Sequence, residues 1–142
     1  MIIAFDLDGT LANIEHRLHF INGKPKDWPA FFRACVDDEP ISEMINLQRS
    51  LCQWHEVEIW SGRSNEVWDE TVKWLNRNHV IYSKLRMRMA GDYRVDNVVK
   101  EAWLLALEPS QRPLLAFDDR QQVVDMWRRN GIRCCQVAPG DF

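Results

Sequence analysis

The chain begins "MIIAFDLDGTLA" (residues 1–12), in which an apolar run ends at two aspartates. Residues 2–5 predict a buried strand, because short apolar runs bounded by turn residues are typical of parallel sheets. Asp6 and Asp8 then project to the same side of an extended chain, and Gly9 permits a tight turn after them. Two neighbouring carboxylates repel each other at the end of a buried strand, so a divalent cation is expected to offset the repulsion.

The rest of the chain alternates between helix-like and strand-like segments. Apolar residues recur at helical spacing in 41–54, with Pro40 suited to the first turn, and in the segment after Ser64 or Asn65, where Val67, Trp68, Thr71, Val72 and Leu75 would share a buried face. Two more helices are predicted at 97–107 and 120–130, and strands at 57–60, 84–89, 113–117 and 132–137. This order predicts an α/β, Rossmann-like three-layer sandwich with a mainly parallel central sheet.

We expect a single domain over residues 1–142, in which residues 12–40 fit the alternation poorly and form a small inserted cap. A net charge of −3 and a pI of about 5.8 argue against bulk coating of nucleic acid, although not against contact with one nucleic-acid end. No apolar run approaches the roughly 18 residues of a membrane span, and no signal peptide is visible. Free thiols in a reducing cytoplasm are expected for Cys35, Cys52, Cys134 and Cys135.

Three predicted strands end in polar residues that could share one site. These residues are Asp6 and Asp8, then Ser61 and Arg63, then Asp118 and Asp119. The carboxyl ends of parallel strands meet at one edge of a sheet, where ligands bind in folds of this class. The sequence therefore predicts a site assembled from distant segments at that edge.

Four segments resemble, in order, the motifs of the haloacid dehalogenase (HAD) superfamily of phosphohydrolases: "FDLDGT" (5–10), "SGR" (61–63), a later lysine, and "FDDR" (117–120). The stretches "GDYRVDNVVKE" (91–101) and "FDDRQQVVDMWRRNGIRCCQVAPGDF" (117–142) are also similar to the 3'-phosphatase domain of bacteriophage-type polynucleotide kinase/phosphatases, which likewise ends in G-D-F. The cap does not clearly match that domain. The phosphate-binding motif G-x-x-x-x-G-K-[ST] does not occur in the sequence, so no kinase half is expected.

The resemblance implies a Mg²⁺-dependent phosphomonoesterase that works through an aspartyl-phosphate. Asp6 would be the nucleophile, and Asp8 would protonate the leaving oxygen and later help to activate water. Mg²⁺ would be held by Asp6, the backbone carbonyl of Asp8 and an acidic residue of the last motif. Asp119 is the first choice for that ligand, and Asp118 would assist through hydrogen bonds.

The same resemblance implies a set of phosphate-binding and substrate-binding residues. Lys100 would neutralise the phosphoryl group and Asp6, and Lys84 is its rival. Asp96 would orient Lys100 or the substrate, or would simply cap the helix that follows it. Arg17 would reach the substrate from the cap, although it could equally be a plain surface arginine. The remaining candidates are Thr10, Ser61, Gly62 and Arg63.

The expected substrate is a 3'-phosphate on a nucleic-acid end or a nucleotide. The alternatives are a phosphatase for 5'-nucleotides or other small esters and, in another class, a non-catalytic binding module. A separate kinase or ligase could be a partner.

A basic run could guide a nucleic-acid end or be an ordinary solvated face, and it consists of Lys84, Arg86, Arg88 and Arg94. The cap aromatics could stack on a base or form a mini-core, and they are His19, Phe20, Trp28, Phe31 and Phe32.

Overall fold

A five-stranded parallel sheet forms the centre of the protein. The computed structural model describes residues 1–140 of the chain. The strands of the sheet lie in the order β5-β4-β1-β6-β7, with β1 between β4 and β6. The strands are β1 (Ile2–Phe5), β4 (Glu56–Ser64), β5 (Lys84–Arg88), β6 (Leu115–Arg120) and β7 (Arg133–Gly140). The chain order reverses at β1, which is where ligands bind in folds of this kind.

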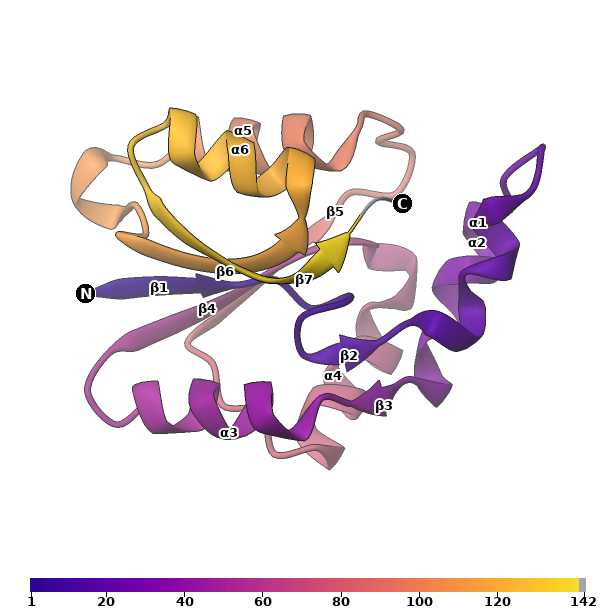
Figure 1. Cartoon of the computed structure of the whole chain (residues 1–142), viewed down its shortest axis with the longest axis horizontal. Coiled ribbons are helices and arrows are strands. Elements are labelled where there is room, and N and C mark those ends of the chain that lie inside the picture. The colour runs from indigo at the N-terminus through magenta and orange to yellow at the C-terminus, as the bar shows by residue number, and fades with distance from the viewer. Residues whose placement is uncertain (141–142) are drawn as a thin grey trace.

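Two helices cover each face of the sheet, and the three layers confirm the predicted α/β architecture (Figure 1). On one face lie α3 (Ser42–Leu51) and α4 (Trp68–Arg77), and on the other lie α5 (Asp96–Leu105) and α6 (Gln121–Arg129). Short 3-10 turns, η3 (Asn65–Val67) and η4 (Pro109–Gln111), precede α4 and β6. Both faces of the central strand are therefore buried, as its continuous apolar sequence predicts.

The alternation of side chains along β1 divides the core between the two faces. Ile3 and Phe5 pack in the cluster that includes α3 and α4, whereas Ala4 packs with Trp60 and the residues of α5 and α6. Successive side chains of a strand point to opposite faces, so a four-residue strand supplies both clusters. The largest fully buried side chains are those of Trp60, Trp74 and Trp127.

Residues 12–40 leave the sheet and return to it through a small antiparallel ribbon of β2 (Ala12–Asn13) and β3 (Glu39–Pro40). Between these strands lie η1 (Glu15–Arg17), α1 (His19–Asn22), α2 (Trp28–Arg33) and η2 (Ala34–Asp37). Ile14, Ile21 and Phe31 are buried there, and the partly buried residues packed against them are Leu18, Phe20, Trp28 and Phe32. The mini-core interpretation is therefore confirmed for Phe20, Trp28, Phe31 and Phe32, whereas His19 is exposed and lies outside this cluster.

Several predicted boundaries were wrong for local reasons. Pro40 does not open α3, because it pairs with Ala12 in the ribbon and the helix begins at Ser42. Trp68 is 41% exposed, because it is the first residue of α4, and Trp74 fills the core instead. Strands β4 and β6 also continue past their predicted C-terminal ends, into the polar motifs themselves.

All four cysteines are free, as expected. Among the described residues, no helix is long and apolar enough to cross a membrane. The final Asp141 and Phe142, on which part of the G-D-F resemblance rests, lie outside the described residues.

Candidate active site

Two irregularities in strand pairing shape the carboxyl edge of the sheet. Between β4 and β5, Ser61 pairs with Met87 and the next pair is Ser64 with Arg88, so two residues bulge out of β4. A second register shift separates Asp118 from Arg120 on β6. Bulges of this kind re-aim side chains next to active sites. Here the first bulge consists of Gly62 and Arg63.

Three buried carboxylates meet where β1 and β6 end. Asp6, Asp118 and Asp119 each offer an oxygen, and these oxygens all lie within 4.8 Å of one another. The Lys100 Nζ atom lies 2.6 Å from Asp6 Oδ1 and 3.0 Å from Asp118 Oδ2. Burial raises the pKa of Asp6 well above its usual value, and Lys100 opposes this shift. One lysine leaves the negative charge of three carboxylates only partly offset.

Two glycines allow the carboxylates to come this close to the backbone. Gly9 has a φ of 85°, and a Cβ atom there would lie 2.1 Å from Asp119 Oδ2. A Cβ atom on Gly62 would lie 2.2 Å from Asp96 Oδ1. Both contacts are far shorter than a van der Waals distance, so the first and second motifs both require glycine for packing, and Gly9 also requires it for its positive φ.

The donor set of the cluster fits a hard divalent cation such as Mg²⁺. Asp118 already accepts from Lys100 and from the backbone N–H of Arg120. Asp119 Oδ1 is buried and has no hydrogen-bond partner among residues 1–140. Burial, followed by the neighbouring Asp118, raises the pKa of Asp119 to about 7. A cation would remove both the charge excess and the unpaired oxygen, which favours Asp119 over Asp118 as a direct ligand.

Asp8 occupies a different environment from Asp6. Its Oδ1 accepts from Arg17 Nη2 and from Arg63 Nε, both at 2.8 Å. Burial raises the pKa of Asp8, but the two guanidinium groups outweigh burial and hold the pKa at about 2. The Asp8 side chain is thus a carboxylate at neutral pH, and it is not part of the three-carboxylate cluster. A metal role for Asp8 therefore stays a prediction about its backbone carbonyl.

Asp38, at the end of the inserted segment, belongs to the candidate site although no sequence pattern indicated it. Its carboxylate accepts from Arg17 Nε and from Arg63 Nη2, each at 2.7 Å, and His16 Nε2 lies 2.8 Å from it. Arg17 and Arg63 are fully buried between Asp38 and Asp8. In the sequence, "DDE" (37–39) resembles a solvated acidic run, and nothing local indicates that its middle residue is buried.

The other predicted site residues lie around these two groups. Ser61 is buried, and its hydroxyl accepts from the backbone N–H of Arg63. Thr10 Oγ1 is buried and has no hydrogen-bond partner in the described chain. Lys100 is fully buried, whereas its rival Lys84 is exposed at the start of β5. Binding of phosphate by Ser61, Gly62 and Thr10 stays a prediction.

The helix-cap alternative for Asp96 is wrong. Asp96 is the first residue of α5, the N-cap position is held by Val95, and Asp96 Oδ1 has no hydrogen-bond partner among the described residues. Its carboxylate lies instead 3.5 Å from Lys100 Nζ and 3.5 Å from Arg88 Nη2. This ionic environment agrees with the expected role of orienting Lys100.

The basic run is largely paired within the protein. Arg86 donates to Glu58 and stacks over Trp60, with its Cζ 4.8 Å from the ring centroid. Arg94 forms an ion pair with Asp92, with Nη2 and Oδ2 2.7 Å apart. These internal partners weaken the hypothesis that the run guides nucleic-acid phosphates, because its charge is already offset.

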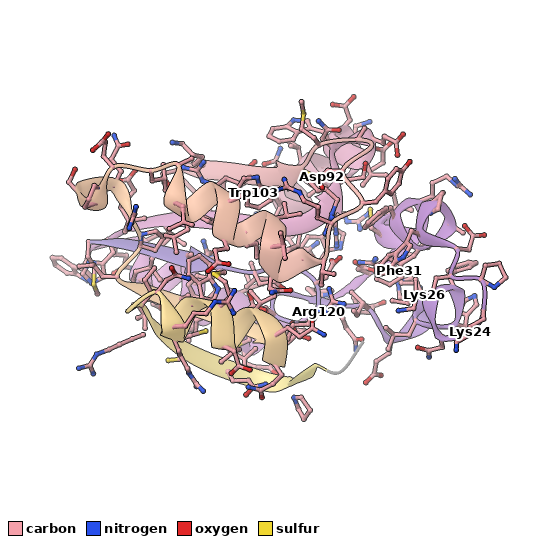
Figure 2. All side chains as sticks on the ribbon, turned by 90° about the horizontal axis from the view of Figure 1, so that it is seen from above. Lys24, Lys26, Phe31, Asp92, Trp103 and Arg120 are labelled. Carbon is pink, nitrogen blue, oxygen red and sulfur yellow. The ribbon has the colours of Figure 1, made fainter. Side chains whose placement is uncertain are left out.

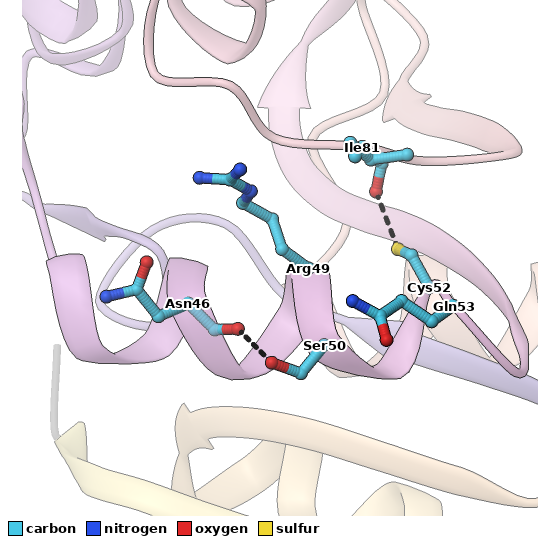
Figure 3. A pocket seen from close by; sticks show the side chains of 6 residues that line it. All are labelled: Asn46, Arg49, Ser50, Cys52, Gln53 and Ile81. Carbon is cyan, nitrogen blue, oxygen red and sulfur yellow. Dashed lines mark hydrogen bonds between the residues drawn. The ribbon is translucent and has the colours of Figure 1, made fainter.

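A shallow hollow of about 480 Å³ lies away from the site, between α3 and the segment before β5 (Figure 3). Ser50 and Cys52 there donate to the carbonyls of Asn46 and Ile81. Cys52 and Ile81 precede β4 and β5, so the hollow lies at the amino edge of the sheet, opposite the carboxylates.

A parallel sheet with an aspartate pair after β1, a buried lysine from α5 and an acidic pair on β6 defines a hydrolase of the HAD class. Solved structures agree with this fold. A HAD-like family hydrolase from Streptococcus pneumoniae is 14% identical over 95% of this chain and 83% of that one, with a TM-score of 0.66. A HAD family enzyme from Bacteroides thetaiotaomicron, solved with magnesium and inorganic phosphate, is 15% identical over 99% of this chain and 96% of that one, with a TM-score of 0.59.

Residues 1–142 match the family described as the polynucleotide kinase PNKP phosphatase domain, and the chain belongs to that family. It is therefore a HAD-type phosphatase. A chain in the structure of a Pnkp1/Rnl/Hen1 complex is 32% identical, with a TM-score of 0.84. The match covers 99% of this chain but 47% of that one, so the present chain spans about half the length of that relative.

Proposed function

We propose that the protein is a Mg²⁺-dependent phosphomonoesterase that removes 3'-phosphates from nucleic-acid ends or nucleotides. The observation that carries the proposal is the buried cluster of Asp6, Asp118 and Asp119, which is joined by Lys100. Bound Mg²⁺ would neutralise the phosphoryl oxygens and the carboxylates. Asp6 and Asp119 are its proposed side-chain ligands, with Asp118 in support, and residues 12–40 are the proposed cap.

Asp6 is the proposed nucleophile. A carboxylate oxygen of Asp6 attacks phosphorus in line, and the bond from phosphorus to the substrate oxygen breaks. Lys100 donates to Asp6 Oδ1 and so fixes the orientation of the carboxylate. Water then attacks the aspartyl-phosphate, which releases inorganic phosphate and restores Asp6.

Asp8 is the proposed proton carrier for both steps. It gives a proton to the leaving oxygen in the first step and takes one from water in the second. With Arg17 and Arg63 in place, Asp8 is in the base form that the second step requires. A substrate phosphate that competes for the two guanidinium groups would weaken their hold on Asp8. Its pKa would then rise, which the first step requires.

A nucleic-acid end is the favoured substrate for two reasons: the family is that of a polynucleotide kinase phosphatase domain, and one similar chain comes from an RNA repair complex. The 32% identical chain belongs to an assembly that a second structure describes as the Pnkp1/Rnl/Hen1 RNA repair complex. A phosphorylated RNA end and a ligase-type partner are therefore proposed for this chain as well. A phosphatase for 5'-nucleotides or other small phosphate esters is the alternative.

The test compares phosphate release, with Mg²⁺ present, from four substrates. They are 3'-phosphorylated and 5'-phosphorylated oligonucleotides and the corresponding mononucleotides, and Asp6→Asn serves as the blank. We expect release from the 3'-phosphates that depends on Mg²⁺ and is absent with Asp6→Asn. Equal or faster release from 5'-mononucleotides would favour the alternative instead.

A further inference from the structure

The loop between β5 and α5, residues 89–95, exposes large apolar side chains beside the candidate active site. Tyr93 is 93% exposed and Met89 is 69% exposed. Figure 2 shows Asp92 of this loop at the same end of the molecule as Phe31 of the cap and Arg120 after the acidic pair. The loop leads directly into Asp96, which faces Lys100.

The backbone of this loop is fixed although its side chains are exposed. Arg88 donates from Nε to the Gly62 carbonyl at 2.8 Å and from Nη1 to the carbonyls of Asp92 and Arg94. Its Nη2 also lies 3.5 Å from Asp96 Oδ1. One guanidinium group therefore joins the loop, the second motif and the start of α5.

Asn65 makes a second connection, from the turn that follows the second motif. Its Oδ1 accepts from the backbone N–H of Ala90 at 2.9 Å, and its Nδ2 lies 3.6 Å from Met89 Sδ. Asp92 and Arg94 are paired across the loop. Both ends of the loop are thus held next to residues 61–65, the segment that is proposed to bind phosphate. Asn65 holds the first end, and Arg88 joins the second end to Gly62.

We propose that Tyr93 and Met89 form a contact surface for the nucleobase next to the phosphate that is removed; this rests on the proposed function. Exposed aromatic side chains on a fixed backbone lose little entropy when a base stacks on them, and such stacking tolerates any base. A methionine thioether adapts to irregular apolar contacts. Because Arg88 and Arg94 are offset by Asp96 and Asp92, the loop favours contact with a base over contact with another phosphate.

The test uses two oligonucleotides with identical 3'-terminal phosphates, one with a base on the last sugar and one abasic there. KM is measured for both with the parent protein, Tyr93→Ala, Tyr93→Phe and Met89→Ala. Trp54→Ala is the matched control, because Trp54 is 82% exposed but lies just before β4, at the opposite edge of the sheet. Thermal unfolding of each variant verifies that it is folded.

We expect Tyr93→Ala to raise KM for the base-carrying oligonucleotide about tenfold more than KM for the abasic one, within the range found for base–aromatic stacking. Tyr93→Phe should keep the parent ratio, Met89→Ala should change it in the same direction by less, and Trp54→Ala should leave it unchanged. Equal KM changes for the two substrates would overturn the inference and leave the proposed function intact. Failure of the parent protein to hydrolyse either substrate would overturn both.

Discussion

The Lys100 Nζ atom lies 2.6 Å from Asp6 Oδ1, although the two residues are 94 positions apart in the chain. Asp6 directly follows the central strand β1, whereas Lys100 projects from α5, in a helical layer that covers one face of the sheet. Burial lowers the pKa of a lysine, but Asp118 and Asp6 outweigh burial and raise the pKa of Lys100 well above its usual value. Lys100 is therefore a permanent cation in a group that otherwise carries only negative charge.

Replacement of Lys100 by methionine should abolish measurable phosphatase activity and also weaken the fold. Removal of one partner from a buried ion pair leaves an uncompensated charge, which costs about 3–5 kcal/mol. We expect a lowered midpoint in urea unfolding and phosphate release at the level of the Asp6→Asn blank. Lys84→Met is the matched control, since Lys84 is exposed on β5. Normal activity of a folded Lys100→Met protein would contradict the assignment.

The sequence was sufficient to predict the layers of the fold and most of the residues that meet at the candidate site. The order of strands and helices predicts a parallel sheet, and such a sheet brings Asp6 and Asp118 together at one edge. Helices, strands and tight turns could be predicted because they depend on local features, namely the spacing of apolar residues and the positions of glycines. The resemblance to a known family added Lys100, which no local pattern distinguishes from a solvated lysine.

Asp38 could not be predicted, because its role depends on contacts across the tertiary structure. Arg17 is 21 positions and Arg63 25 positions away from it in the chain. The bulge in β4 aims Arg63 at Asp8 and Asp38, and a register shift of this kind leaves no periodic signal. The pairing of the basic run was missed for the same reason, since Glu58 and Arg86 meet only across neighbouring strands.

Asp119→Asn should separate metal binding from folding. The amide removes a buried charge that Asp118 repels, so the metal-free variant should unfold at a higher temperature than the parent. Mg²⁺ should raise the melting temperature of the parent, because it binds the folded state, but not that of the variant. A Mg²⁺-dependent rise in Asp119→Asn equal to that of the parent would contradict the ligand assignment.

Asp38→Asn should damage both stability and catalysis, although Asp38 lies outside the carboxylate cluster. The carboxylate receives hydrogen bonds from two buried arginines, and its loss leaves their charges under-compensated. We expect about 3 kcal/mol lower stability and a lower kcat, because Arg17 and Arg63 would no longer be held against Asp8. The neighbouring Asp37→Asn, at an exposed position, is the control and should behave like the parent.

The pairing of Asp8 with its two arginines should appear as acid sensitivity of the fold. Its pKa is lowered from 3.8 to about 2 in the folded protein, so the folded state binds fewer protons than the unfolded chain in this range. The contribution is fully present above pH 4 and is lost as the pH falls toward 2, and it amounts to roughly 2 kcal/mol. Urea unfolding of the parent and of Asp8→Asn at pH 5 and pH 2.5 measures it. The difference in unfolding free energy between the two proteins should shrink at the lower pH, and a constant difference would contradict the pairing.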